Sequence, residues 1–186
     1  MKKLFVIANW MQGNGLSGGD RIFIELVKRW QLQLNITLFL SKEGSAICKR
    51  HELGDINQKV WASNFFSRWG YLVDILYRTL NSIINAFSVK TVAGDIIFSS
   101  SDFWPDSFPA LILKKRNPKI TWIAGFYLFA PKPWQKNSPY RGKRFLTGFL
   151  YWIGQLPAYY IIRKYADVVF VTSQPDVDRF ITHIRS

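Results

Sequence analysis

The sequence predicts an α/β fold: a doubly wound, mostly parallel sheet with helices on both faces. Two observations lead to this prediction. Short apolar runs recur along the chain, and segments with helical periodicity lie between them. Strand–helix–strand connections of this kind are almost always right-handed, which leaves few other arrangements. The 186 residues are enough for one ordinary domain with a core and too few for two large ones.

Five apolar runs have the length of strands in a parallel sheet. Such strands are buried on both faces, because helices cover the sheet on each side, and they therefore read as nearly continuous apolar segments. The predicted strands are "LFVIA" (4–8), "ITLFL" (36–40), "DIIFSS" (95–100), "KITWIA" (119–124) and "DVVFVTS" (167–173).

Three segments between these runs have the periodicity of amphipathic helices. The first places Ile22, Phe23, Leu26, Val27 and Trp30 on one side. The second covers about 68–87, with Leu72, Ile75, Leu76, Leu80, Ile83 and Ile84 on one side. The third covers about 106–116 and ends before Asn117-Pro118, because proline disfavours helix in the residue that precedes it.

Composition limits the partners and the compartment. The formal net charge of +13 predicts a surface that attracts phosphates, nucleic acid or anionic lipid head groups. Cys48 is the single cysteine, which excludes an internal disulfide and a Cys-rich zinc site and is typical of a cytoplasmic protein. Aromatic residues make up 17% of the chain, so they must fill a core, a partner surface or a membrane interface.

A glycine-rich segment, "GNGLSGGDR" (13–21), joins the first predicted strand to the first predicted helix. In a doubly wound sheet this turn opens at the carboxyl end of the strands, where ligands bind, and glycines let the backbone come close to them. The N-terminus of the following helix offers free N–H groups and a positive dipole to an anion. The segment therefore predicts a loop that approaches a phosphate.

Two other interpretations of this segment stay open. Gly13-x-Gly15-x-x-Gly18 matches the dinucleotide-binding fingerprint, and Glu43 lies where a ribose-binding acid is expected. In that fingerprint, however, the first glycine follows the strand almost directly, whereas three residues intervene here. In the second interpretation the segment is a purely structural turn, in which the negative charge of Asp20 stabilises the N-terminus of the following helix.

Three stretches of the chain, taken in order, resemble the N-terminal domain of family 4 glycosyltransferases. They correspond to that family's Gly-Gly-x-x-Arg opening, its mid-domain strand–helix–strand unit, and a strand and helix near the end of the domain. The stretches are "GLSGGDRIFIELVKRW" (15–30), "GDIIFSSSDFWPDSFPALILKKRNPKITWIAGFYLFAP" (94–131) and "YADVVFVTSQPDVDRF" (165–180). The resemblance implies one Rossmann-like acceptor-side domain over 1–186, the N-terminal half of a GT-B architecture.

Enzymes of this family transfer a sugar from a nucleotide-sugar donor with retention of configuration, and the resemblance implies that reaction here. Their glycine loop can approach the donor diphosphate, a role that would fall to Gly15, Ser17, Gly18 and Gly19. Backbone N–H groups there could stabilise the charge that develops on a leaving diphosphate. The resemblance implies no metal and no cofactor, with the nucleotide-sugar as substrate.

Residues of the acceptor side are expected after two strands. Ser101 and Asp102 follow the strand 95–100, although strand-terminal turn chemistry explains both equally well. Tyr127 stands where many members of the family have a histidine that contacts sugar or acceptor. His51 and His183 lie elsewhere in the chain and are expected at the surface, so no catalytic residue is identified.

The family's donor site is missing from this chain. That site carries a Glu-x7-Glu pattern in the C-terminal domain, and no two glutamates here have that spacing. We therefore expect the donor-binding domain to be absent from this chain, which would be a fragment or a subunit whose partner supplies the donor site.

A basic, aromatic segment precedes a long uncharged one. Residues 131–144 hold Lys132, Lys136, Arg141, Lys143 and Arg144 and no acid, and residues 145–162 hold no charge at all. The uncharged run could be a buried helix, an interfacial helix or a membrane span, although Gly148, Gly154, Gln155 and Pro157 interrupt it. The cations predict contact with anionic lipid or an anionic acceptor. No recognisable nucleic-acid module accompanies them, so nucleic acid is not an expected partner.

The sequence thus predicts an acceptor-binding domain of a glycosyltransferase of polysaccharide biosynthesis, inactive alone and peripheral to the cytoplasmic face of a membrane. Its expected partners are a nucleotide-sugar donor, a glycan or lipid-linked acceptor and a donor-domain subunit. Two alternatives remain: an NAD(P)-dependent oxidoreductase domain, and a non-catalytic subunit that anchors a split glycosyltransferase to the membrane.

Overall fold

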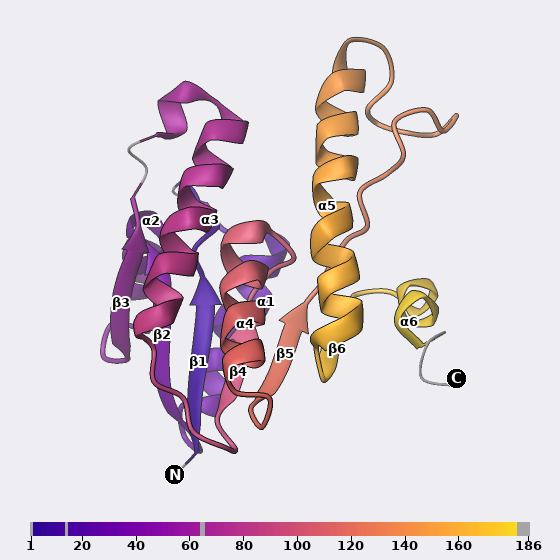
Figure 1. Ribbon diagram of the computed structural model, residues 1–186. Coiled ribbons are helices and arrows are strands. Elements are labelled where there is room, and N and C mark those ends of the chain that lie inside the picture. The colour runs from indigo at the N-terminus through magenta and orange to yellow at the C-terminus, as the bar shows by residue number, and fades with distance from the viewer. Residues whose placement is uncertain (1, 14, 64–65, 182–186) are drawn as a thin grey trace.

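A single parallel sheet forms the centre of the protein (Figure 1). The computed structural model describes residues 2–13, 15–63 and 66–181, and within them six parallel strands follow the order β3-β2-β1-β4-β5-β6. The strands are β1 (Lys3–Ala8), β2 (Asn35–Ser41), β3 (Asn57–Ala62), β4 (Ile96–Ser99), β5 (Thr121–Gly125) and β6 (Val168–Phe170). The order reverses between β1 and β4, where such sheets bind ligands beyond the carboxyl ends of the strands.

Helices cover both faces of this sheet, which confirms the predicted doubly wound, Rossmann-like fold (Figure 1). One face carries α1 (Gly18–Trp30) and α2 (Lys42–Arg50), and the other carries α3 (Tyr71–Ser88), α4 (Trp104–Arg116) and α5 (Phe145–Tyr165). Two short 3₁₀ turns, η1 (Ser67–Trp69) and η2 (Gly142–Arg144), precede α3 and α5, and α6 (Gln174–Ile181) follows β6.

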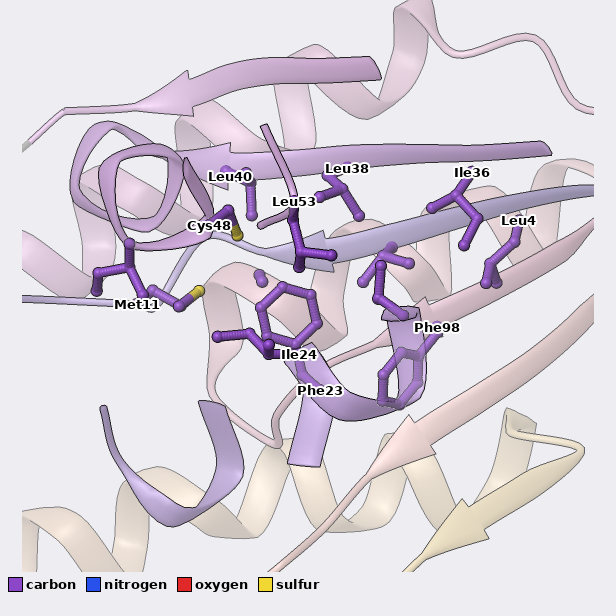
Figure 2. Close-up of a cluster of buried hydrophobic side chains, with 14 residues drawn as sticks. Leu4, Met11, Phe23, Ile24, Ile36, Leu38, Leu40, Cys48, Leu53 and Phe98 are labelled. Carbon is purple, nitrogen blue, oxygen red and sulfur yellow. The ribbon is translucent and has the colours of Figure 1, made fainter. Parts of the chain in front are cut away.

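Side chains of β1 alternate between two cores, as the period of a strand requires. Leu4 and Val6 point into a cluster with side chains of α1 and α2, including Cys48 (Figure 2). Phe5 and Ile7 point to the other face and pack in a cluster with side chains of α3, α4 and α5. Burial raises the pKa of Cys48 to about 12, helped by the charge of Asp20, so this thiol is an uncharged packing residue.

Two elements on one edge of the sheet were not predicted, β3 and α2. The strand β3 begins with the polar run "NQK" and exposes Asn57, Lys59 and Val60, because it lies at the sheet edge. The helix α2 has nine residues, and its N-cap is Ser41, whose hydroxyl accepts from the Gly44 N–H and donates to the Met11 carbonyl. Neither element has the long apolar pattern by which the others were predicted.

The first helix begins earlier than expected. Gly18 and Gly19 form its first turn, instead of a loop in front of it, and Ser17 is the N-cap. The Ser17 hydroxyl accepts from the Asp20 N–H, and the Asp20 carboxylate accepts from the Ser17 N–H, so the two residues form a capping box. The stabilisation of this helix end by Asp20 is therefore a direct hydrogen-bonding effect.

The helix α3 turns its apolar side away from the sheet. Leu72, Leu76, Leu80 and Ile84 are 50–67% exposed, while the opposite side buries Asp74, Arg78, Thr79 and Ser82. Arg78 is the centre of this inward-facing polar side and is completely buried. Its guanidinium pairs with Asp74 at 3.1 Å and with Glu43 at 3.4 Å, and it donates to the Asn9 carbonyl at 3.1 Å. A buried charge is tolerated only with such partners.

The uncharged run 145–162 forms most of α5. Gln155, Ala158 and Ile162 are buried, whereas Phe145 and Leu146 in the first turn are exposed. In the part of the chain that the structure describes, no helix combines the length and hydropathy that crossing a bilayer requires.

Candidate functional site

Five of the residues predicted for the site lie around one cavity at the carboxyl edge of the sheet. Ser17, Gly19, Ser101, Asp102 and Tyr127 line it, and they come from α1 and from the loops after β4 and β5. We call this space of about 230 Å³ the edge cavity. Its remaining walls come from Trp10 and Met11 after β1, Asp20, Ser100, Phe103, Asp106, Leu128, and Tyr151 of α5.

The Asp106 carboxylate, which was not predicted, ties the ends of β1 and β4 together. Its Oδ1 accepts from the N–H groups of Asn9 at 2.6 Å and Trp10 at 3.1 Å. Its Oδ2 accepts from the hydroxyls of Ser100 at 3.2 Å and Ser101. Burial raises the pKa of Asp106 to about 7 even though all four donors favour the charged form. The only sequence signal for this role is an acidic residue in the first turn of a helix that follows a strand.

Gln155 of α5 holds the second buried carboxyl, Asp102. The Gln155 amide donates to Asp102 Oδ2 at 2.8 Å and to the Leu128 carbonyl at 2.7 Å, and its oxygen accepts from the Ala130 N–H at 2.8 Å. Burial raises the pKa of Asp102 to about 6 against the lowering effect of the Gln155 hydrogen bond. A residue that only seemed to interrupt an apolar run thus joins α5 to the loops after β4 and β5.

Tyr127 lies against two glycines that make room for it. A Cβ at Gly19 would come within 2.9 Å of the Tyr127 ring, and one at Gly125 within 2.7 Å of its hydroxyl. Glycine at position 19 is therefore required by close packing, independently of any ligand. The hydroxyl of Tyr127 is buried without a hydrogen-bond partner among the described residues. Burial, reinforced by Asp106, Asp102 and Asp20, raises the pKa of Tyr127, so the group is a neutral phenol.

The other predicted residues lie outside this cavity. Gly15 is exposed, and so is Gly18, with no atom near the place a Cβ would take. Glu43, which a dinucleotide site would need for a ribose, is ion-paired with Arg78. His51 is half-buried at the end of α2, and His183 lies outside the described residues.

The five predicted cations are exposed along the segment between β5 and α5, which runs beside α5 (Figure 1). Lys132 and Lys136 lie in the loop, and Arg141 donates to the Lys136 carbonyl at 3.1 Å. Lys143 and Arg144 belong to η2, directly before the exposed Phe145.

A larger space, the aromatic groove, adjoins the edge cavity. It has a volume of about 740 Å³, lies between the first turns of α3 and α5, and shares Trp10, Phe103 and Tyr151 with the edge cavity. The Trp10 and Phe103 rings stack at 4.9 Å, and the Phe103 and Tyr151 rings at 6.2 Å. No part of the groove was predicted, because its residues are scattered through the sequence.

The chemistry of the edge cavity suits an uncharged, hydroxyl-rich ligand. The polar side chains among the described lining residues carry hydroxyls or carboxyls, apolar side chains such as Trp10 and Met11 lie beside them, and no lysine, arginine or histidine is included. In the described chain, no three His, Cys, Asp or Glu side chains are grouped so that they could hold a metal ion.

The fold is similar to part of a solved protein, HepE. HepE (Alr3699) of Anabaena matches in its complex with UDP-glucose, with 14% identity, a TM-score of 0.52 and 96% of this chain covered. In its complex with UDP and glucose it matches with 16% identity, a TM-score of 0.53 and 97% covered. This chain spans about 40% of the HepE chain. No protein-family model and no curated protein matches the chain.

The free energy of unfolding of the Asp102→Asn variant should increase, relative to that of the natural protein, as pH rises from 4 to 7. The Asp102 carboxyl, whose pKa is raised from 3.8 to about 6, binds a proton more tightly in the folded than in the unfolded state. The stability of the natural protein therefore falls as the pH rises through this range and the proton is lost. Asparagine keeps an oxygen for the Gln155 amide and never becomes charged. Urea unfolding at several pH values should show a relative gain of about 2 kcal/mol with an unchanged m-value. A difference independent of pH would contradict the raised pKa.

Proposed function

We propose that this chain is the acceptor-binding domain of a glycosyltransferase that transfers a sugar from a nucleotide-sugar donor to a glycan or lipid-linked acceptor. One observation carries the proposal: five of the residues predicted for the site line a single cavity at the switch point of the sheet. Three of them were expected from the resemblance to family 4 glycosyltransferases, and two, Ser101 and Asp102, from their place after a strand. The shared fold with HepE, a protein solved with UDP-glucose, supports the same class.

The acceptor sugar, in this proposal, occupies the edge cavity. Asp102 keeps acceptor capacity beside its Gln155 bond, and Tyr127 presents a hydroxyl without a partner among the described residues. A sugar hydroxyl could donate to the Asp102 carboxylate and accept from the Tyr127 phenol. Asp102 is buried, and the half-buried Tyr127 ring is packed against Gly19 and Gly125, so such hydrogen bonds would form at little cost in side-chain entropy.

The donor diphosphate is proposed to approach the N-terminus of α1. Gly18 and Gly19 supply the first two N–H groups of the helix, and Ser17 supplies a hydroxyl. These groups would stabilise charge on the leaving diphosphate in a retaining, GT-B type transfer. The Asp20 carboxylate opposes such an anion, so we assign the main donor contacts to a second domain or subunit, without which the chain is inactive.

The exposed cations are proposed to hold this domain at an anionic membrane on its cytoplasmic side. Arg141, Lys143 and Arg144 lie next to the exposed Phe145 and Leu146 at the start of α5. Cations beside exposed apolar side chains are the arrangement that anionic lipid surfaces bind.

Tyr127→Phe should weaken sugar transfer, because it removes one hydrogen-bond donor and little volume. The protein is purified by an affinity tag from the cells that make it, so that associated domains or subunits are retained. Transfer from radiolabelled UDP-hexoses to a lipid extract of these cells is then measured. We expect kcat/KM to fall about threefold to tenfold in Tyr127→Phe.

The matched control is Tyr160→Phe, since Tyr160 is 61% exposed on α5 and lines neither the edge cavity nor the aromatic groove. It should transfer like the natural protein. Equal effects of the two substitutions, or no transfer from any nucleotide-sugar, would contradict the proposal. Vesicle binding without transfer would instead favour a non-catalytic anchoring subunit.

Replacing the cations at the start of α5 should weaken membrane binding. The variant Arg141→Glu, Lys143→Glu, Arg144→Glu should bind phosphatidylglycerol vesicles at least tenfold more weakly in a sedimentation assay, because each cation near such a surface contributes about 1 kcal/mol. The control, Lys2→Glu, Lys3→Glu, Lys90→Glu, makes the same change in net charge at exposed lysines far from α5's first turn. Equal losses in the two variants would mean that only net charge matters.

A further inference from the structure

The aromatic groove is an open apolar surface that the core does not need. Trp69, Leu72 and Val73 on its α3 side are 40–63% exposed. Leu72 and Val73 are exposed because the polar side of α3, which carries Arg78, faces inward and the apolar side faces outward, and Trp69 lies in η1, just before this helix. The described lining contains no charged side chain. Apolar patches of this kind mark binding sites on protein surfaces.

The groove and the edge cavity lie side by side and share three lining residues. Trp10, Phe103 and Tyr151 belong to both, and their stacked rings form the wall between the apolar and the polar space. A ligand that fills both must therefore be amphiphilic, with a hydroxyl-rich end near Asp102 and an apolar end near Leu72.

We infer that the aromatic groove binds the hydrocarbon chain of a glycolipid acceptor whose sugar occupies the edge cavity. The inference rests on the proposed function and names its acceptor class. Charge complementarity favours a lipid over a free glycan, because Arg141, Lys143 and Arg144 lie beside the α5 end of the groove and suit the anionic linkage or head groups around such a chain.

Alkyl glucosides of increasing chain length test this inference on the chain itself. Methyl, hexyl, heptyl and octyl β-glucoside are titrated below their micelle concentrations by calorimetry. From hexyl to octyl, each added methylene should tighten binding about threefold to fourfold, as expected for burial of a CH₂ group. Octyl glucoside should also bind at least tenfold more tightly than an octyl phosphocholine, which lacks the sugar. Equal affinities for methyl and octyl glucoside would overturn the inference.

Two leucines of α3 provide matched variants. Leu72 lines the groove and Leu80 does not, although they are 51% and 60% exposed on the same side of the helix. Leu72→Glu should abolish the dependence on chain length, and Leu80→Glu should keep it, with the fold of each checked by circular dichroism. Equal behaviour of the two variants would overturn the assignment to this groove.

Failure here is distinguishable from failure of the proposed function. If transfer proceeds as well to methyl as to octyl glucoside, the glycosyltransferase proposal stands and the groove inference falls. If binding depends on chain length and on Leu72 but no nucleotide-sugar supports transfer, the groove inference stands as lipid binding and the transferase proposal falls.

Discussion

One buried carboxylate, that of Asp106, connects the ends of β1 and β4, the neighbouring parallel strands between which the strand order of the sheet reverses. It accepts hydrogen bonds from the backbone N–H groups of Asn9 and Trp10 after β1 and from the hydroxyls of Ser100 and Ser101 after β4, and all four donors are uncharged groups. A buried carboxylate with four donors fixes its neighbours strongly, because losing it would leave several polar groups unsatisfied. Trp10 and Phe103 lie in the segments just after these two strands, so fixing the strand ends also positions the wall that the cavity and the groove share.

Asn9 is fixed from both sides of its backbone. Its N–H donates to Asp106 and its carbonyl accepts from Arg78, so the end of β1 is connected to α4 and α3. The same Arg78 makes the inner side of α3 polar and leaves the apolar side outside. The fixed end of β1 and the exposed apolar side of α3 are thus both linked to one buried guanidinium and its partners Asp74 and Glu43.

The sequence predicts the sheet well, because the central strands are buried on both faces and read as apolar runs. It predicts β3 and α2 poorly, since an edge strand and a short helix bury little. For α3, periodicity identifies the helix and its two sides, but the tertiary contacts of Arg78 decide which side faces inward. An Asp74–Arg78 pair at i, i+4 within an apolar segment was the available signal.

The positions of candidate site residues were predictable where a strand or helix end places them. Ser101, Asp102 and Tyr127 follow strands, and they do line one cavity. Gln155, Tyr151 and Asp106 were missed because their roles depend on how α5 and α4 pack, which local sequence does not encode. Gly19 was assigned to a phosphate and is already explained by the Tyr127 ring.

Backbone hydrogen exchange with and without octyl glucoside tests most directly whether the carboxyl edge between β1, β4 and β5 is the ligand site. Slower exchange is predicted at residues 9–12, 100–107 and 126–130, with unchanged exchange at residues 90–95 and 117–119 near the amino ends of the strands. Protection confined to the amino ends of the strands, or no protection at the carboxyl edge, would contradict the site.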